Sequence, residues 1–413
     1  MSITIGVLGN DLRAEVLPWG AVRQSSCAET LDWFVAADDR WHVPSREPTI
    51  RQVRLLGTPV VETRLRVPSG DVVHRSFCVP DSGGLVVVQV ENDSPLPVAV
   101  AFAGAPFLGS RVPAAKPVPG IDLPDDARVV PIGHRAQVTV ALSRDRTAGG
   151  GSLPASLPAP HQVVAGWTAT VHRASRIDVP DGSLVEALVE ARCDLVLGPP
   201  HTDADDPIDV LLALHHHVRM LGGDDDTVLD VAAASARLAR ALRRRTVSDP
   251  AGAAAALDAA EAIAWRLGDE RAAADVAALR RHQIARGALD VSVRLDDRGH
   301  ATPARVATTV EQALAHRGDL LPGGIPVDWW GNDFEVHGVP TEPGSSVSYA
   351  IRWHGERPAV LWETAGPGVT LTASRAAPGW SSEQMSGEAL WPAPVRQEAA
   401  VASTDASASE SFS

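Results

Sequence analysis

The sequence predicts a multidomain chain of β and α structure, with an antiparallel β-sandwich, then antiparallel helical hairpins, then a small β-module. The period of the apolar residues predicts it: they alternate with polar residues up to about residue 175, recur every three to four residues over 182–318, and alternate again over 325–392. We therefore expect a sandwich over 1–175, a helical-hairpin domain over 182–318, a C-terminal β-module over 325–392 and a disordered tail over 395–413.

Composition limits the class of function. The 413 residues are 45% hydrophobic, which is typical of a globular protein, and carry a net charge of -14 at pH 7. A chain this acidic is a poor match for the phosphates of nucleic acid or for anionic lipid, so we expect neither as a partner. Lys116 is the only lysine, and it lies in a proline-rich stretch that suggests an exposed loop.

Several features favour a cytoplasmic location. The N-terminus has no basic region followed by a long apolar stretch, so no secretory signal is expected. Cys27, Cys78 and Cys193 are odd in number and lack metal-ligand spacing, which favours buried thiols over a disulfide framework. The longest stretch without Asp, Glu, Lys or Arg, 147–172, is too polar and too broken by Gly and Pro to span a bilayer.

The first 175 residues show the pattern of strands. Apolar residues alternate with charged or polar ones over 61–67 and over 73–79, with a Pro68-Ser69-Gly70 turn between them, so we expect a hairpin with one buried face. No amphipathic helix is predicted between the strands, which favours a sandwich. Further strands are predicted at 85–90, 98–102, 129–130, 138–140 and 163–171.

Helix-start signals dominate the middle of the chain. The pairs Asp206-Pro207, Asp249-Pro250 and Thr302-Pro303 each place a capping residue before a proline that suits the first turn. The connections between successive helices are very short, so neighbouring helices must be antiparallel. Six helices are predicted, starting at Ser183, Asp206, the Asp224-Asp225-Asp226 run, Asp249, Asp269 and Thr302. The third of these should bury a stripe of Val228, Val231, Ala232, Ser235, Leu238, Ala239 and Leu242.

Tryptophan is concentrated in the C-terminal β-module. Two strands are predicted there, over 347–353 and 358–363, with Trp353 on the inward face of the first. Because flat indole faces stack on sugar rings, we expect a stacking surface in this module first. Six of the eleven tryptophans lie here: Trp329, Trp330, Trp353, Trp362, Trp380 and Trp391.

This arrangement resembles the glycoside hydrolases built on an (α/α) toroid, of the glucoamylase-like and trehalase-like kind. The resemblance rests on residues 57–64 with the turn at Ser69-Gly70, on the strand and polar turn over 88–94, and on Arg352-Trp353-His354-Gly355-Glu356-Arg357-Pro358 near the end. It implies a protein of carbohydrate metabolism. The predicted helices are half the number in the family's toroid, and most loops between them are short. No catalytic carboxylate of the family can be matched, so we expect a carbohydrate-binding pseudoenzyme or a weak hydrolase.

The tryptophan-rich module also holds acids that suit carbohydrate chemistry. Glycoside hydrolysis uses two carboxylates on either side of one bond, and carboxylates also bind sugar hydroxyls. The alternative is a structural corner of packed tryptophan with solvated acids. The candidate site residues are Asp328, Asp333 and Glu335 for catalysis, with Trp329, Trp330, Arg352 and His354 for binding substrate.

Other polar clusters favour structural roles. His215, His216 and His217 are consecutive, so on a helix they point about 100° apart and cannot chelate one ion; an exposed or interfacial helix face is expected. The acidic loop over 201–206 suits helix capping better than calcium. The arginines over 240–245 complement a helix C-terminus, with an acidic partner as the alternative. We expect no metal and no cofactor. A glycan is the expected partner, and a protein-interaction scaffold is the alternative function.

Overall fold

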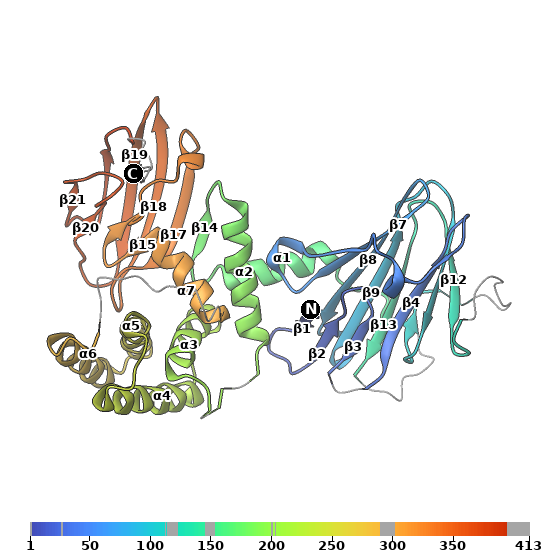
Figure 1. Cartoon of the computed structure of the whole chain (residues 1–413), viewed down its shortest axis with the longest axis horizontal. Coiled ribbons are helices and arrows are strands. Elements are labelled where there is room, and N and C mark those ends of the chain that lie inside the picture. The colour runs from blue at the N-terminus through green and yellow to red at the C-terminus, as the bar shows by residue number, and fades with distance from the viewer. Residues whose placement is uncertain are drawn as a thin grey trace, which may run out of the picture.

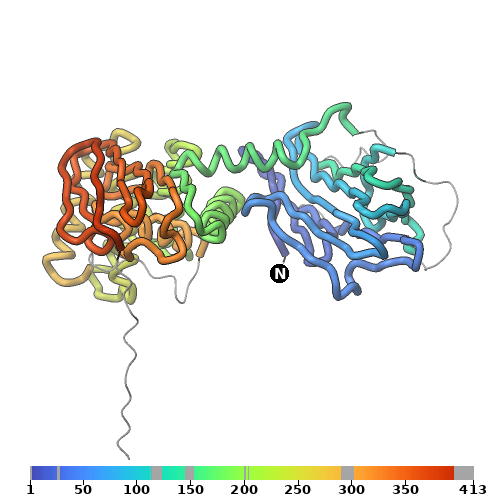
Figure 2. Tube along the Cα trace, turned by 90° about the horizontal axis from the view of Figure 1, so that it is seen from above, coloured from blue at the N-terminus to red at the C-terminus, as the bar shows by residue number. Residues whose placement is uncertain are grey.

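The computed structural model describes residues 2–25, 28–111, 113, 123–144, 153–199, 201–202, 204–289 and 302–394. The chain forms two lobes, with α1 (Pro160–Val171) and α2 (Gly182–Leu197) between them (Figures 1 and 2). No helix in these described ranges is long and apolar enough to cross a membrane. The predictions for Cys27, Lys116, Asp203 and the tail over 395–413 fall outside the described residues.

The N-terminal lobe is the predicted antiparallel β-sandwich. One sheet has the order β1-β2-β3-β4-β10-β12 with β5 beside β4, and the other has the order β11-β13-β9-β8-β7-β6. Apolar side chains of both sheets, among them Trp33, Leu65 and Phe102, fill one core. The first sheet comprises β1 (Ile3–Gly6), β2 (Arg13–Val16), β3 (Val22–Gln24), β4 (Thr30–Ala36), β5 (Trp41–His42), β10 (Val98–Ala103) and β12 (Arg128–Ile132). The second comprises β6 (Arg51–Arg54), β7 (Val61–Val67), β8 (Gly70–Val79), β9 (Leu85–Asn92), β11 (Leu108–Gly109) and β13 (Gln137–Ser143).

Residues 163–171, predicted as a strand, instead belong to helix α1. Val164 of α1 packs on Phe77 and Val87, which point away from the sandwich core. Strand β8 is therefore buried on both faces, not on one as predicted. A short apolar run rich in valine suits a strand and a buried helix equally well, and only the start at Pro160 favoured the helix.

The central region contains the six predicted helices. The side chains of Asp206, Asp224, Asp249, Asp269 and Thr302 each accept a hydrogen bond from a backbone N–H of the first turn, as their capping role requires. Helix α3 packs against α4, α5 and α7 and is the central helix of the group. After α2, the helices are α3 (Pro207–Leu221), α4 (Asp225–Arg244), α5 (Pro250–Arg266), α6 (Glu270–Ala285) and α7 (Pro303–Leu314).

Two local predictions for the helices were wrong. Helix α2 begins two residues earlier than expected, because Asp181 and not Ser183 caps it, and the Asp181 carboxylate accepts hydrogen bonds from the N–H groups of Ser183 and Leu184. On α4, Val228 and Ala232 are exposed instead of buried. Helix α4 lies at the outer edge of the group (Figure 1), so only a narrow stripe of it, centred on Leu238, is covered.

The C-terminal β-module forms a sheet of order β14-β17-β18-β19-β22 and a smaller one of order β15-β16-β20-β21. Strand β14, which directly follows α1 in sequence, pairs antiparallel with β17, so that Ile177 lies opposite Val336. Strand β14, which precedes helices α2 to α7 in the sequence, therefore forms part of the C-terminal sheet, whose other strands all follow those helices. The strands are β14 (Arg176–Asp178), β15 (Ala315–His316), β16 (Asp319–Leu320), β17 (Phe334–Pro340), β18 (Ser346–His354), β19 (Arg357–Ala365), β20 (Leu371–Thr372), β21 (Ser381–Ser382) and β22 (Ser386–Leu390).

Most of the clustered tryptophans build the core of this module. Trp380 makes edge-on contacts with Trp362 and Trp391, with ring centroids 5.2 and 5.4 Å apart. Trp391 is 1% exposed. Trp353 lies near the end of β18 and is only partly buried, with its indole N–H donating to the Asn332 carbonyl at 2.8 Å. Its neighbours on the inward face of the strand are fully buried, as predicted.

Candidate functional site

Two of the three predicted acids, Asp333 and Glu335, lie beside Arg352 at the C-terminal sheet. Arg352 donates to the Glu335 carboxylate, and its Nε lies 4.0 Å from Asp333 Oδ2. His337 Nε2 lies 3.0 Å from Glu335 Oε2. The hydrogen bonds from Arg352 and His337 hold the pKa of Glu335 below its ordinary value. A general acid needs a raised pKa, so this environment favours an ionised, paired carboxylate at Glu335.

The other predicted site residues are dispersed. Trp329 is 6% exposed and packs edge-on against Phe334, with ring centroids 5.1 Å apart, so no indole face is free for a sugar. Trp330 is partly buried, and its indole N–H donates to the Ile325 carbonyl. Asp328 and His354 are exposed. The structure thus joins Asp333, Glu335 and Arg352, but none of the seven predicted residues lines the three cavities described below.

The three consecutive histidines lie on α3, where His216 is buried and His215 and His217 are partly exposed. His216 is fully buried, and its Nε2 lies 3.1 Å from Thr308 Oγ1 of α7, so the interfacial alternative is the one observed. Burial lowers the pKa of His215 to about 3 and holds that of His216 well below its ordinary value, so both are neutral at pH 7. In the described part of the chain, no group of three or more His, Cys, Asp or Glu side chains could hold a metal ion.

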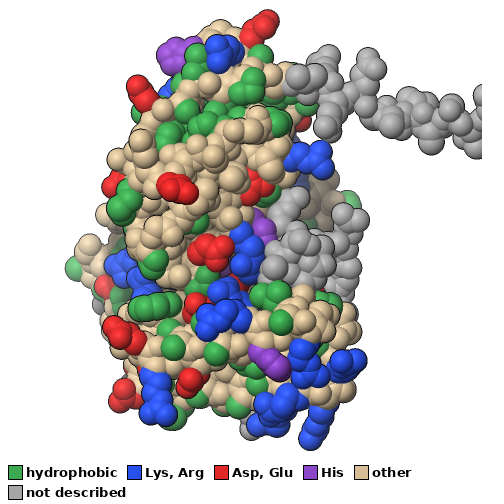
Figure 3. All heavy atoms as spheres, turned by 90° about the vertical axis from the view of Figure 1, so that its left-hand side faces the viewer, with side chains coloured by type: hydrophobic (Ala, Val, Ile, Leu, Met, Phe, Trp, Pro, Cys, Tyr) green, Lys and Arg blue, Asp and Glu red, His purple; other side chains and the backbone are tan. Residues whose placement is uncertain are grey.

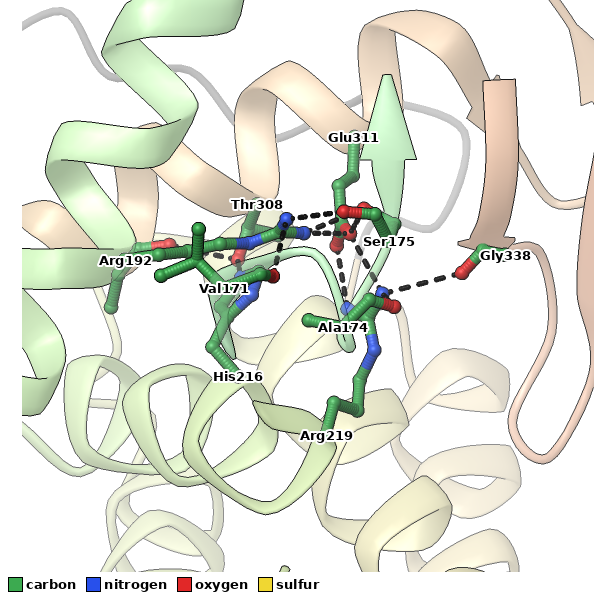
Figure 4. Close-up of polar contacts among 10 residues, drawn as sticks. Val171, Ala174, Ser175, Arg192, His216, Arg219, Thr308, Glu311 and Gly338 are labelled. Carbon is green, nitrogen blue, oxygen red and sulfur yellow. Dashed lines mark hydrogen bonds and ion pairs between the residues drawn. The ribbon is translucent and has the colours of Figure 1, made fainter. Parts of the chain in front are cut away.

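Beside these histidines is a buried ion-pair network that joins three helices (Figure 4). Glu311 of α7 accepts hydrogen bonds from Arg192 of α2 at 2.6 Å and from both terminal nitrogens of Arg219 of α3 at 2.8 Å. The Ser175 hydroxyl donates to the same carboxylate at 2.6 Å. Further donors of the two arginines bind backbone carbonyls, including that of Gly338 in β17. The network therefore ties α2, α3 and α7 to the C-terminal sheet.

The network carries an excess of positive charge, with two guanidinium groups for one carboxylate. Burial alone would raise the pKa of Glu311, but the charges of Arg219 and Arg192 outweigh it and hold that pKa well below its ordinary value. Burial lowers the pKa of Arg192 to about 10, which leaves it protonated at pH 7. The three side chains therefore remain ionised, and their net charge near neutral pH is positive.

A cavity of about 450 Å³ adjoins this network, between α3, the end of α5 and the C-terminal strands. Its volume lies within the range of about 300–1,000 Å³ usual for sites that bind small molecules. Arg219 of the network and His215 form part of its wall. The other polar or aromatic residues that line it are Arg173, Trp265, Arg266, Glu342, Ser345 and Ser346.

Trp265 is the aromatic side chain of this cavity. It lies in the last turn of α5 and is 45% exposed, unlike the buried tryptophans of the β-module. The backbone of Gly344 approaches its pyrrole ring so closely that a Cβ there would lie 3.6 Å from Cγ. Gly344 also has a φ of +80°, which a residue with a side chain rarely adopts. The loop from β17 to β18 therefore supports the indole while much of it stays exposed.

Two arginines line the same cavity without a partner. Arg173 follows α1, Arg266 is the last residue of α5, and both are exposed. Within the described ranges, neither side chain makes a hydrogen bond or an ion pair. By contrast, Arg280 and Arg317 bind Asp258, which joins α6 and the turn after β15 to α5. Figure 3 shows acidic and basic side chains close together over the middle of one face of the molecule. Arg173 and Arg266 are thus available to a ligand.

Glu342 is the carboxylate that lines this cavity. Burial raises its pKa, opposed by the charge of Arg317, whose Nη1 lies 3.6 Å from Oε2. Asp258 and Glu311 line a smaller adjoining cavity of about 70 Å³, but arginines already bind both. Among the described residues, no second free carboxylate faces Glu342 across the 450 Å³ cavity, so the pair that glycoside hydrolysis needs is not formed there.

A third cavity, of about 1010 Å³, lies in the N-terminal lobe between α1 and the second sheet of the sandwich. The strands contribute Glu62, Arg75, Gln89 and Gln137 to its polar lining, and α1 with the residue after it contributes His161, Thr168 and His172. Arg75 donates to Glu62 at 2.8 Å and to Glu91 at 2.7 Å, so its charge is already paired. This groove presents paired charges and amides, whereas the cavity beside Trp265 presents free cations.

Sequence reasoning missed Trp265, Arg173 and Arg266. One signal could have found Trp265: it lies off the stripe of Leu257, Ala260 and Ala264 that α5 buries, which would place a large aromatic residue on an outward face. No such signal marks Arg173 or Arg266. Their proximity depends on how α1, α5 and the loop after β17 meet.

The fold and the cavity define a multidomain protein with a ligand-sized cavity between its helices and its C-terminal β-module. No family model and no curated protein matches the sequence. Among solved structures, the GH92 family glycosyl hydrolase CcMan5 is similar over 66% of this chain and 50% of its own, with a TM-score of 0.17 and 13% sequence identity. This chain therefore spans half the length of that structure, and so weak a likeness carries no argument about activity.

Proposed function

We propose that this chain binds a carbohydrate in the cavity beside Trp265. The exposed indole at that cavity is the observation that carries the proposal, because sugar rings stack their C–H faces on aromatic side chains while their hydroxyls bind polar groups. Ser346, Glu342 and Arg266 supply donors and acceptors around the indole. The ring and the hydroxyls of a sugar would thus each find a matching group.

The same proposal assigns little or no hydrolytic activity. A hydrolase of the usual kind needs an acid and a second carboxylate about 5–9.5 Å away. Glu342 has the raised pKa of an acid, but the nearby Asp258 and Glu311 are bound by arginines. We therefore expect weak or absent hydrolysis of simple α-glucosides, as for a glycoside hydrolase-like protein with a shortened helical region.

The proposal extends to the division of the chain and to its location. We place the domains at 1–175, 182–318 and 325–392. Strand β14 lies just after the first of these domains in the sequence and pairs with β17 of the C-terminal module. A reducing cytoplasm suits the free thiols of Cys78 and Cys193, both buried, and burial raises the pKa of Cys193 to about 12.

Glycan-array screening followed by calorimetry on the best ligand tests the proposal. Trp265→Ala should abolish or strongly weaken binding. Trp330→Ala is the matched control, since Trp330 lies in the site predicted from sequence and outside this cavity. If Trp330→Ala abolished binding and Trp265→Ala did not, the binding site would lie in the β-module and the proposed cavity would be wrong. Absence of any glycan binding would favour a protein-interaction scaffold, for which the exposed Val228 and Leu229 on α4 offer an apolar contact.

A reducing-sugar assay tests the catalytic part. Wild type should release little or no sugar from α-glucosides, and Glu342→Gln should leave that low level unchanged. Turnover that disappears in Asp333→Asn or Glu335→Gln would contradict the non-catalytic assignment and support the acids predicted from sequence.

A further inference from the structure

We infer that the ligand of the Trp265 cavity carries an anionic group, a carboxylate or a phosphate, which Arg173 and Arg266 bind. The inference rests on the proposed carbohydrate site and names its ligand as an acidic carbohydrate. Both arginines line the cavity, both are exposed, and their side chains have no partner within the described ranges.

The charge around the cavity is positive, against the acidic balance of the whole chain. Arg173, Arg219 and Arg266 line it, against the single carboxylate of Glu342. Arg219 shares Glu311 with Arg192, so the network behind the wall adds positive charge instead of cancelling it. A cavity that keeps unpaired cations in a protein of net charge -14 attracts anions in preference to neutral molecules.

The residue types match an anionic sugar in detail. A guanidinium group presents a planar fork of donors that fits a carboxylate or a phosphate with two hydrogen bonds. Burial raises the pKa of Glu342, so protonating this carboxyl when an anion binds nearby costs less than protonating an exposed carboxylate. Trp265 would stack on the ring that bears the anionic group. His215 stays neutral, so the cations of this site do not depend on its titration.

Arg266 also complements the C-terminal dipole of α5, so the test must distinguish this structural role from ligand binding. A purely structural role predicts a loss of stability without a change in ligand preference. Arg244 is the matched control: it is exposed and is the last residue of α4, as Arg266 is of α5, but it does not line the cavity.

The test is calorimetric titration of the full chain with glucose, glucuronate, glucose 6-phosphate and inorganic phosphate. We expect glucuronate or glucose 6-phosphate to bind at least about tenfold more tightly than glucose, since hydrogen bonds to charged groups contribute more than a factor of ten. Arg173→Gln and Arg266→Gln should each remove most of that preference, because each weakens the binding of the acidic sugars far more than the binding of glucose. Arg244→Gln should keep it. Preference for glucuronate identifies a carboxylate, and preference for glucose 6-phosphate identifies a phosphate.

The outcomes separate this inference from the proposed function. If glucose binds as tightly as both acidic sugars, and the Arg173 and Arg266 variants bind like wild type, the anionic ligand is refuted while the carbohydrate site stands. If inorganic phosphate binds and depends on both arginines, but no sugar binds, the anion site is supported and the carbohydrate proposal fails. Binding of none of the four probes refutes the inference.

Discussion

Replacing Glu311 with glutamine should strongly destabilise the lobe that contains the helices and the C-terminal sheet. The Glu311 carboxylate is 4% exposed and accepts hydrogen bonds from Ser175, Arg192 and Arg219. Glutamine keeps the shape but removes the negative charge, so two buried guanidinium groups lose their counter-ion. Its amide would also place donors against Arg219 Nη1, which now donates to Oε2 at 2.8 Å. Breaking a buried ion pair in this way costs about 3–5 kcal/mol of unfolding free energy.

Urea unfolding followed by tryptophan fluorescence measures the effect. With a urea dependence of about 3 kcal/mol per molar, the unfolding midpoint of the Glu311→Gln variant should fall by about 1–2 M. Glu335→Gln is the control, because arginine also binds Glu335, but on a solvent-exposed face where water screens the pair. Equal midpoint shifts in the two variants would refute the reasoning, because burial would then add nothing to the interaction.

Two further predictions concern tryptophan and histidine. Trp391→Ala should lower the unfolding free energy by about 3–5 kcal/mol because its indole is 1% exposed, and Trp353→Ala should lower it less because that indole is only partly buried. Equal losses in urea unfolding would contradict the burial argument. Burial lowers the pKa of His215 to about 3 and holds that of His216 well below its ordinary value, so both stay neutral in the folded chain, whereas the unfolded chain protonates them below about pH 6.5. Their contribution to stability is therefore complete above that pH and is lost as the pH falls toward 3, by up to about 1.4 kcal/mol per pH unit for each histidine. Urea midpoints at pH 7, 6 and 5 should show this loss, His216→Asn should reduce it and His354→Asn, on the exposed surface, should not; a midpoint independent of pH would overturn the prediction.

The candidate site shows where reasoning from sequence stops. The predicted acids Asp333 and Glu335 do meet Arg352, because Asp333 directly precedes β17, Glu335 lies on β17 and Arg352 lies on the paired strand β18. Trp329 is close to these acids in the sequence, but its side chain is buried in the core. Closeness in sequence does not determine the direction in which an indole points. The cavity beside Trp265 could not be predicted, because its lining comes from five segments that are distant in sequence.

The sequence by itself determined the order of the secondary structure and most of its boundaries. Caps such as Asp206 and Thr302 act through hydrogen bonds within the first turn, and the alternation over 61–67 and 347–353 follows from one face of each strand being buried. These are local effects, readable within a few residues. Only the tertiary structure decided that β14 completes the C-terminal sheet and that Glu311 meets two arginines from other helices. Those interactions depend on the packing of distant segments, which also excludes the water that would otherwise screen the charges.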